Sequence, residues 1–223
     1  MAPLVRRTLT EQTYAELRRR ILGFEYPVGD RLDVETIARE LEVSPSPVKD
    51  ALRQLASEGL VEIQPRRGTS IRRFSRADVM EIFGVRGIIE PGAMAAAARG
   101  GGLTPAVMAA LEDTFREIAA ASEGHDFRDH AAALEADTQF HLLVVEATGN
   151  AELLALARTF LGKARMMRHF AQGLPRAQAT IEEHRRIVDA LKSGREAAIE
   201  SAVRDHLRRA RDGILALMDE RGL

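Results

Sequence analysis

The sequence predicts a mainly α-helical protein of two domains, residues 1–74 and 75–223, and three observations lead to this prediction. Apolar residues recur at helical spacing along most of the 223 residues, and short Gly- or Pro-containing breaks separate these stretches. Two short strand-like runs, 60–64 and 69–73, stand close together and are joined by a Pro-Arg-Arg-Gly turn. From residue 75 onward the pattern is wholly helical.

Composition excludes several classes of protein. The chain has no Cys, so disulfides and thiolate metal sites are ruled out. No apolar run approaches the ~20 residues of a membrane span, and the first residues lack a signal-peptide core, so we expect a cytoplasmic protein with no membrane partner. Aromatic residues are only 4% of the chain and Trp is absent, which suits helical cores built from Leu, Ile, Val and Ala.

The first domain begins with a helix predicted over residues 10–22 and closed by Gly23. Residues 24–32 read as a turn, and a second helix is expected over 34–41. A third helix follows up to Gly59, and the strand-like runs then form a hairpin. Three helices followed by a hairpin make a winged helix-turn-helix.

The start of the third helix is sharply defined. Ser44 can cap it, and Pro45 and Pro47 lie in its first turn, where a missing amide hydrogen breaks no intrahelical bond. Polar residues gather at this end of the helix, which suggests that it faces an anion. They are Ser44, Ser46, Lys49 and Arg53.

The hairpin is strongly basic. Within residues 61–76 five arginines stand against a single acidic residue, Glu62. They are Arg66, Arg67, Arg72, Arg73 and Arg76. A local basic patch of this kind matters more for a polyanionic partner than the net charge of the whole chain, which is −1. Duplex DNA is therefore the expected partner of the first domain.

The second domain is predicted to be an all-α antiparallel bundle of six or seven helices. Pro91 and Gly92 should kink the first of them, and Asn150 is interpreted as a helix cap. The expected helices span residues 76–98, 105–121, 126–147, 151–171, 175–192 and 196–219.

Four ionisable residues lie on apolar helix faces of this bundle. Asp137 and His141 are four residues apart and share one face, while His184 and His206 lie on inward stripes of two later helices. Left unpaired, each would cost a few kcal/mol, and one divalent metal would satisfy all four. Taken singly, each histidine is more often a hydrogen-bonded core residue than a metal ligand. Three imidazoles and a carboxylate suit zinc first, with nickel, manganese or iron as alternatives.

The remaining histidines fall at loop or polar-face positions. They are His125, His130 and His169, and we expect all three to be surface residues.

The segment YPVGDRLDVETIARELEVSPSPVKDALRQLASEGLVEIQPRRGTSI resembles the DNA-binding domain of the GntR superfamily of bacterial transcription regulators. The second half resembles the FCD effector domain of the FadR-like branch, whose metal motif matches the four residues above in order, type and the step from His184 to His206. The resemblance implies a homodimer that binds a palindromic operator and senses a small carboxylate.

The resemblance also implies which residues contact DNA. The family usually has Arg at the position of Pro45, so base reading should shift to Ser46, Lys49 and Arg53 or to the hairpin, where Gly68 permits a close approach of the backbone. The alternative for Lys49 and Arg53 is a solvated helix face. The full expected set is Arg31, Ser44, Ser46, Lys49, Arg53, Arg66, Arg67 and Gly68.

Two arginines are expected near the effector. Arg86 resembles the family's arginine beside the effector pocket, although an i,i+4 ion pair with Glu90 is an equal alternative. Arg165 is a second pocket candidate. We expect a repressor that is relieved by its ligand, and not an enzyme, because no general base accompanies the ligand set. The alternatives are a regulator for which the metal itself is the signal and a metalloenzyme with an Asp/His3 site.

Overall fold

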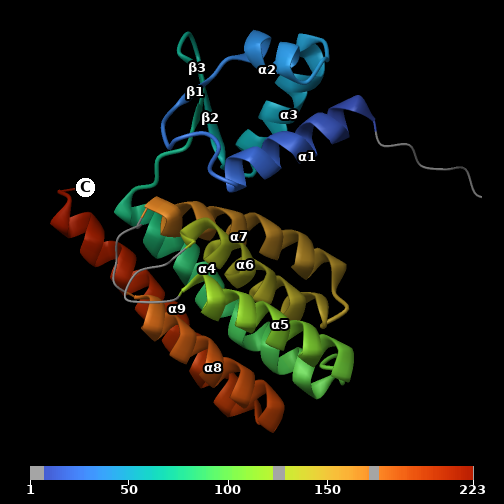
Figure 1. The fold of residues 1–223 in the computed structure, drawn as a ribbon, viewed down its shortest axis with the longest axis vertical. Coiled ribbons are helices and arrows are strands. Elements are labelled where there is room, and N and C mark those ends of the chain that lie inside the picture. The colour runs from blue at the N-terminus through green and yellow to red at the C-terminus, as the bar shows by residue number, and fades with distance from the viewer. Residues whose placement is uncertain (1–7, 123–128, 171–175, 223) are drawn as a thin grey trace, which may run out of the picture. The chain divides into compact units, whose positions relative to one another are not determined.

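The computed structural model describes residues 8–122, 129–170 and 176–222. The chain divides into two compact units, Met1–Arg73 and Phe74–Leu223 (Figure 1). Within the described residues, no helix combines the length and the apolar character that crossing a bilayer requires.

The first unit contains the three expected helices, α1 (Leu9–Leu22), α2 (Val34–Glu40) and α3 (Pro45–Ser57). Local caps fix where two of them begin: Thr8 and Glu11 form a reciprocal capping box at α1, and the Asp33 side chain accepts a hydrogen bond from the amide of Thr36 at α2. Their apolar faces meet in one core, since Leu17, Ile21, Val48, Leu52 and Leu55 are all buried.

The expected hairpin is formed by β2 (Val61–Gln64) and β3 (Gly68–Ile71), which confirms the winged arrangement. A further strand, β1 (Arg31–Leu32), pairs antiparallel with β3, so the sheet order is β1-β3-β2. The prediction that these two residues belong to a turn was wrong. A strand of two residues shows no alternation of its own, and its pairing with β3 depends on residues nearly 40 positions away.

The tip of this hairpin, residues 65–67, is called the wing tip below. The amide of Arg67 donates to the carbonyl of Gln64 at 3.1 Å. Arg66 has φ of 66° and Gly68 has φ of 85°; the first is unusual for a residue with a side chain. The Arg31 guanidinium donates to the carbonyl of Arg67, so β1 helps to hold the wing tip in place.

The second unit contains the six expected helices in the expected order. Side chains of Ser75, Thr104, Asp129 and Asn150 accept hydrogen bonds at four helix starts, and the last confirms the cap predicted from the sequence. The expected limits at 126, 171 and 175 lie outside the described residues. The helices are α4 (Arg76–Arg99), α5 (Pro105–Ala121), α6 (His130–Glu146), α7 (Ala151–Phe170), α8 (Ala177–Ser193) and α9 (Glu196–Glu220).

These helices pack as an antiparallel bundle in which α4 lies along α9 and α5 lies along α6 (Figure 1). The largest apolar cluster draws on α4, α5, α6, α8 and α9, and Phe140 is completely buried within it. Since α6, α8 and α9 all contribute to this core, polar residues on their inward faces are brought close to one another.

Helix α4 continues through Pro91. Proline has no amide hydrogen, so the carbonyl of Gly87, four residues earlier, loses its usual donor. The Arg204 guanidinium from α9 donates to that carbonyl at 2.8 Å and replaces the missing bond. The kink expected at Pro91 remains a prediction.

Candidate functional site

The structure brings together the four residues that the sequence singled out as metal ligands. Asp137 and His141 come from α6, His184 from α8 and His206 from α9. One ligand atom from each lies within 4.8 Å of the other three, close enough to share an ion. All four side chains are buried. This set is called the metal centre below.

The atoms that face one another in the metal centre have no hydrogen-bond partner among the described residues. They are Oδ1 of Asp137 and the Nε2 atoms of His141, His184 and His206. Nε2 of His184 lies 3.2 Å from Oδ1 of Asp137. An unsatisfied buried polar atom costs about 1–3 kcal/mol, so a bound cation would stabilise this arrangement.

The other ring nitrogen of His184 shows which tautomer is present. Nδ1 lies 2.9 Å from the carbonyl oxygen of Thr180. A carbonyl only accepts, so Nδ1 must donate, and Nε2 is left with a lone pair directed into the metal centre. This is the form in which imidazole binds a metal.

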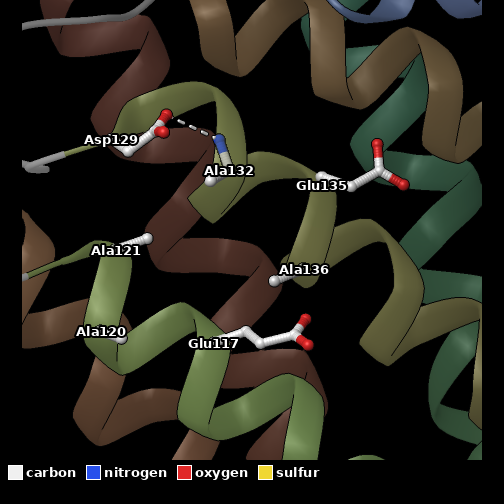
Figure 2. Close-up of a pocket in the computed structure, with 7 residues that line it drawn as sticks. All are labelled: Glu117, Ala120, Ala121, Asp129, Ala132, Glu135 and Ala136. Carbon is white, nitrogen blue, oxygen red and sulfur yellow. Dashed lines mark hydrogen bonds between the residues drawn. The ribbon is translucent and has the colours of Figure 1, made fainter.

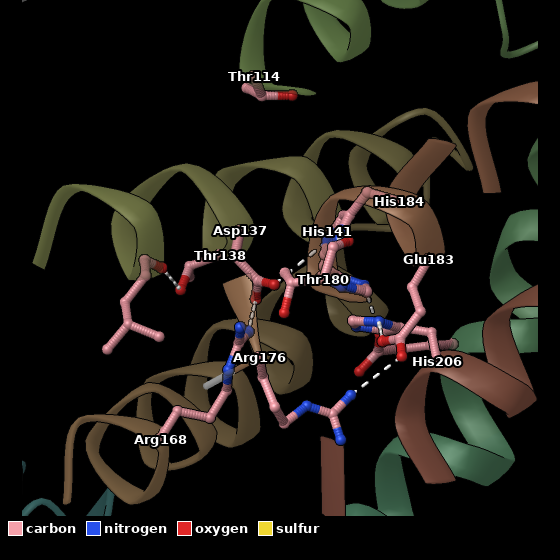
Figure 3. Close-up of polar contacts among 12 residues, drawn as sticks. Thr114, Asp137, Thr138, His141, Arg168, Arg176, Thr180, Glu183, His184 and His206 are labelled. Atoms are coloured by element: carbon pink, nitrogen blue, oxygen red, sulfur yellow. Dashed lines mark hydrogen bonds and ion pairs between the residues drawn. The ribbon is translucent and has the colours of Figure 1, made fainter. Parts of the chain in front are cut away.

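Carboxylates take the same place behind the other two histidines, and Figure 3 shows one of them, Glu183, beside His206. Nδ1 of His206 lies 3.1 Å from Oε2 of Glu183, and Nδ1 of His141 lies 2.7 Å from Oε2 of Glu90. Metal-binding histidines in proteins are commonly oriented by such partners. The donor set of three nitrogens and one carboxylate oxygen, with oriented rings behind it, therefore fits a divalent ion such as zinc.

Each carboxylate around the metal centre is in turn paired with an arginine. In the most buried pair, Nε of Arg86 lies 2.5 Å from Oε1 of Glu90, and both side chains are at most 1% exposed. The three pairs are Arg86–Glu90, Arg168–Asp137 and Arg176–Glu183. Arg168, Arg176 and Glu183 were not predicted from the sequence.

These pairs set the protonation of the centre. Burial raises the pKa of Asp137, but Arg168 and His184 outweigh it and hold the pKa well below its ordinary value. Burial likewise opposes ionisation of Glu90, yet the attraction of Arg86 and His141 lowers its pKa to about 2. Burial and the neighbouring His184 and His141 lower the pKa of His206, which favours the neutral ring.

The two arginines expected near an effector, Arg86 and Arg165, have different partners in the structure. Arg86 is fully buried, stacks over the ring of Phe83 and binds Glu90, so that carboxylate links it to His141 of the metal centre. Arg165 pairs with Glu135 instead. The contact of these two arginines with an effector remains a prediction.

Two of the histidines expected at the surface are half-buried, so that expectation was wrong for His130 and His169. Their rings lie 5.8 Å apart, and Nε2 of His130 is 3.3 Å from the carbonyl of Arg168. Burial lowers the pKa of His130 to about 4. His125 lies outside the described residues.

A pocket of about 620 Å³ lies between α5 and α6 (Figure 2). Four alanines line it together with Glu117, Asp129 and Glu135. Three carboxylates would repel an anion, so this pocket is a poor site for a carboxylate effector.

The candidate nucleic-acid interface lies in the first unit. Helix α3 buries Val48 and Leu52 and exposes Ser46, Lys49 and Arg53. Arg53 forms an ion pair with Asp50 at 2.5 Å, whereas the structure gives Lys49 no such partner among the described residues. The exposed side of α3 thus carries the polar residues predicted to meet DNA.

Ser44 occupies the capping position of α3, but its side chain makes no capping hydrogen bond. The expected cap was wrong: Pro47, the third residue of the helix, has no amide hydrogen to donate, and the Ser44 side chain does not accept from the amide of Ser46 either. The Ser44 side chain is exposed.

The wing tip and its neighbours are also exposed. Arg66, Arg67 and Gly68 form the tip and the start of β3, and the backbone at Gly68 adopts a positive φ that suits glycine. Arg31 is exposed as well, although its guanidinium is engaged with the carbonyl of Arg67.

Two family models match the chain. The model of the bacterial regulatory proteins of the gntR family matches residues 9–71, and the FCD domain model matches residues 81–209.

Similar proteins agree with these matches. A protein named "Probable D-xylose utilization operon transcriptional repressor" from Paenarthrobacter nicotinovorans is 32% identical over 92% of this chain and 88% of its own length. The HTH-type transcriptional regulator LutR of Bacillus subtilis is 29% identical over 88% of this chain and 96% of its own. The solved structure of E. coli McbR/YncC superposes with a TM-score of 0.82 at 20% identity, covering 97% of this chain and 100% of that one.

The families and relatives are transcription regulators, which confirms that the chain is not an enzyme and sets aside the metalloenzyme alternative. The recessed Asp/His3 centre in the second unit and the winged helix in the first therefore occur in one DNA-binding transcription regulator, and this chain belongs to the GntR family with an FCD domain.

Proposed function

We propose that this protein is a metal-containing repressor that a small carboxylate releases from its operator. Residues 1–74 bind the DNA, and residues 75–223 bind the metal and the effector and form the dimer. The single observation that carries the proposal is the metal centre, where four buried ligand atoms converge from three helices and find no hydrogen-bond partner in the described part of the chain.

The DNA-binding part of the proposal rests on two exposed features of the first unit. Lys49 and Arg53 on α3 are placed to contact base edges, and Arg66 and Arg67 at the wing tip are placed to contact phosphates. Replacing Lys49 or Arg53 by Ala should change the preference between operator variants. A uniform loss across variants would reassign that residue to phosphate contact.

The dimer would form along an apolar stripe on α4. Met80, Val85 and Ile88 are exposed there, with Ile88 77% exposed. Gly84 and Gly92 lie beside them, and a side chain at either position would meet open space. Small residues within an apolar stripe allow a second helix to approach closely, and an exposed apolar surface of this kind suits a partner protein.

Ile88→Arg tests this dimer, with Gln178→Arg on α8 as a control that adds the same charge to another exposed position. Sedimentation of the full chain should show a monomer for the first variant and a dimer for the second. A dimer of unchanged affinity in Ile88→Arg would contradict the α4 interface.

The function itself is tested on the full chain, first stripped of metal with a chelator and then reloaded with zinc. Elemental analysis gives the metal content, and fluorescence anisotropy with a DNA site selected from a random pool gives operator affinity. We expect about one metal per chain and operator binding that weakens when a small carboxylate is added to the loaded protein.

The alternatives predict different outcomes of the same experiment. If zinc alone changes operator affinity at micromolar concentration and no carboxylate has a further effect, the metal is the signal. If the purified protein holds no metal and binds none on reloading, the proposed metal role is wrong.

A further inference from the structure

Helix α3 carries a single acidic residue, Asp50, on the side of the helix that is predicted to meet DNA. Asp50 lies four residues after Ser46 and three before Arg53, so the three side chains share one face of the helix. The Asp50 side chain is 45% exposed. Duplex DNA is a dense row of phosphates, so a carboxylate on this face lowers the affinity for any DNA sequence. Asp50 must therefore have a role that offsets this loss.

Two ordinary roles of a helical carboxylate do not explain Asp50. It is the sixth residue of α3, whereas acidic side chains stabilise a helix through its macrodipole only in the first turn. Its partner among the described residues is Arg53 of the same helix, so the contact does not tie α3 to another element. An ion pair as exposed as this one also contributes little to stability. Stability therefore gives no reason for a carboxylate here.

The contact with Asp50 orients the guanidinium group of Arg53. Nη1 of Arg53 donates to Oδ1 of Asp50 at 2.5 Å, and the Arg53 side chain is 68% exposed. In the described part of the chain, Nε and Nη2 of Arg53 have no acceptor, so this edge of the group is free for a ligand. Two neighbouring N–H donors on one edge match O6 and N7 of guanine in the major groove, which is the commonest base-specific contact of arginine.

We propose that Asp50 is a positioning residue, which holds Arg53 in the orientation that reads a guanine of the operator. An arginine that is already ordered loses less side-chain freedom when it binds the correct base. Held by Asp50, the guanidinium is also less able to turn toward a phosphate, so wrong sequences lose more affinity than the operator does. The inference rests on the proposed function, because it requires that α3 present its polar face to the base edges.

The test compares two affinities of the full chain, one for the operator selected from a random pool and one for a scrambled duplex of the same length. Both are measured by fluorescence anisotropy at one salt concentration, and their ratio is the sequence preference. Asp50→Asn should bind the scrambled duplex more tightly than the wild type does, because a negative charge is lost. Its sequence preference should fall by about tenfold, within the roughly 5–150-fold that one base contact provides. A substitution that only damaged the fold would weaken both affinities.

Three further variants identify the cause. Asp50→Glu keeps the carboxylate and should retain more of the sequence preference than Asp50→Asn does. Asp113→Asn removes the same charge from an exposed pair of the same spacing on α5, Asp113 with Arg116, and should leave the preference unchanged. Arg53→Ala lacks the group that Asp50 holds, so adding Asp50→Asn to it should cause no further loss of preference.

The outcomes separate this inference from the proposed function. An Arg53→Ala variant with full sequence preference overturns both this inference and the base contact proposed for Arg53. If Arg53→Ala loses preference while Asp50→Asn keeps it, the role of Asp50 alone is overturned. If Asp50→Asn causes the same loss in the wild type and in Arg53→Ala, Asp50 contacts a base itself, and the positioning role is again overturned.

Discussion

Removing the charge of Arg86 should destabilise the second unit more than any surface substitution. Arg86→Met leaves the Glu90 carboxylate, which is 0% exposed, without its strongest counter-charge. Removing one partner of a buried ion pair costs about 3–5 kcal/mol. For a unit of this size each kcal/mol lowers the melting temperature by roughly 2–4 °C, so we expect a decrease of roughly 6–20 °C.

The second variant, Arg86→Met with Glu90→Gln, isolates the cause. It removes the stranded charge, so it should recover a large part of the loss even though it contains one more substitution. Urea unfolding of the chelated full chain, followed by far-UV circular dichroism at pH 7, gives the free energy of unfolding for all three proteins. A loss below about 1 kcal/mol in the single variant, or a double variant no more stable than the single, would refute the reasoning.

The stability of Arg86→Met relative to the wild type should depend on pH in a defined direction. In the wild type the folded pKa of Glu90 is about 2 against an ordinary value of 4.5, so its ionised form stabilises the fold above pH 4.5, and this contribution is lost as the pH falls toward 2. In Arg86→Met burial remains while the main attraction is gone, so the folded pKa rises. The deficit of the variant relative to the wild type should therefore shrink as the pH is lowered from 7 to 5.

Three further predictions follow from other parts of the molecule. Arg66→Ala with Arg67→Ala should weaken binding to every DNA sequence. The slope of log K against log salt concentration should become shallower by the amount that about two phosphate contacts contribute. Unchanged affinity at moderate salt would contradict the wing assignment. His184→Ala and His206→Ala should each lower the metal content and remove the stabilisation that bound metal gives, which is about 2.7 kcal/mol at a free metal concentration of 100 times the Kd. The winged helix should stay folded and keep nonspecific DNA binding. Full metal occupancy in the double variant, measured by elemental analysis, would falsify the site. His130 has a folded pKa of about 4 against an ordinary value of 6.5, so the neutral ring stabilises the fold at pH 7 and this contribution is lost as the pH falls from 6.5 to 4. Between pH 7 and pH 5 the melting temperature of His130→Gln should therefore fall less than that of the wild type. An equal fall in both proteins would show that another group titrates.

The helices could be predicted from the sequence because their limits are set locally. Thr8, Asp33, Ser75 and Asn150 each stand one residue before a helix and donate or accept within one turn. Strand β1 could not be predicted in the same way, because its two residues become a strand only through pairing with β3.

The metal ligands could be proposed because each is an ionisable residue on an otherwise apolar helix face. Their partner Glu183 was missed because it contacts His206 across α8 and α9, and a contact between helices leaves no spacing in one helix to detect. Arg168 had a usable signal: it follows Leu161 and Ala164, both buried, at seven and four residues and so continues an apolar stripe of α7.

Helix α4 has a stretch that bends more easily than the rest, between Gly87 and Pro91, and this stretch lies next to the metal centre. Between Gly87 and Pro91 the backbone ladder lacks a bond, and a long arginine side chain from α9 stands in for it. A flexible side chain can follow a moving carbonyl where a backbone amide cannot, so α4 bends there at lower cost than anywhere along its unbroken turns. Glu90, which contacts His141, lies within this stretch, immediately before Pro91. A small displacement of His141 would therefore act, through Glu90, on the stretch of α4 that bends most easily. A bend there changes the angle between the two halves of the helix, and a small change of angle would move the ends of α4 by a larger distance.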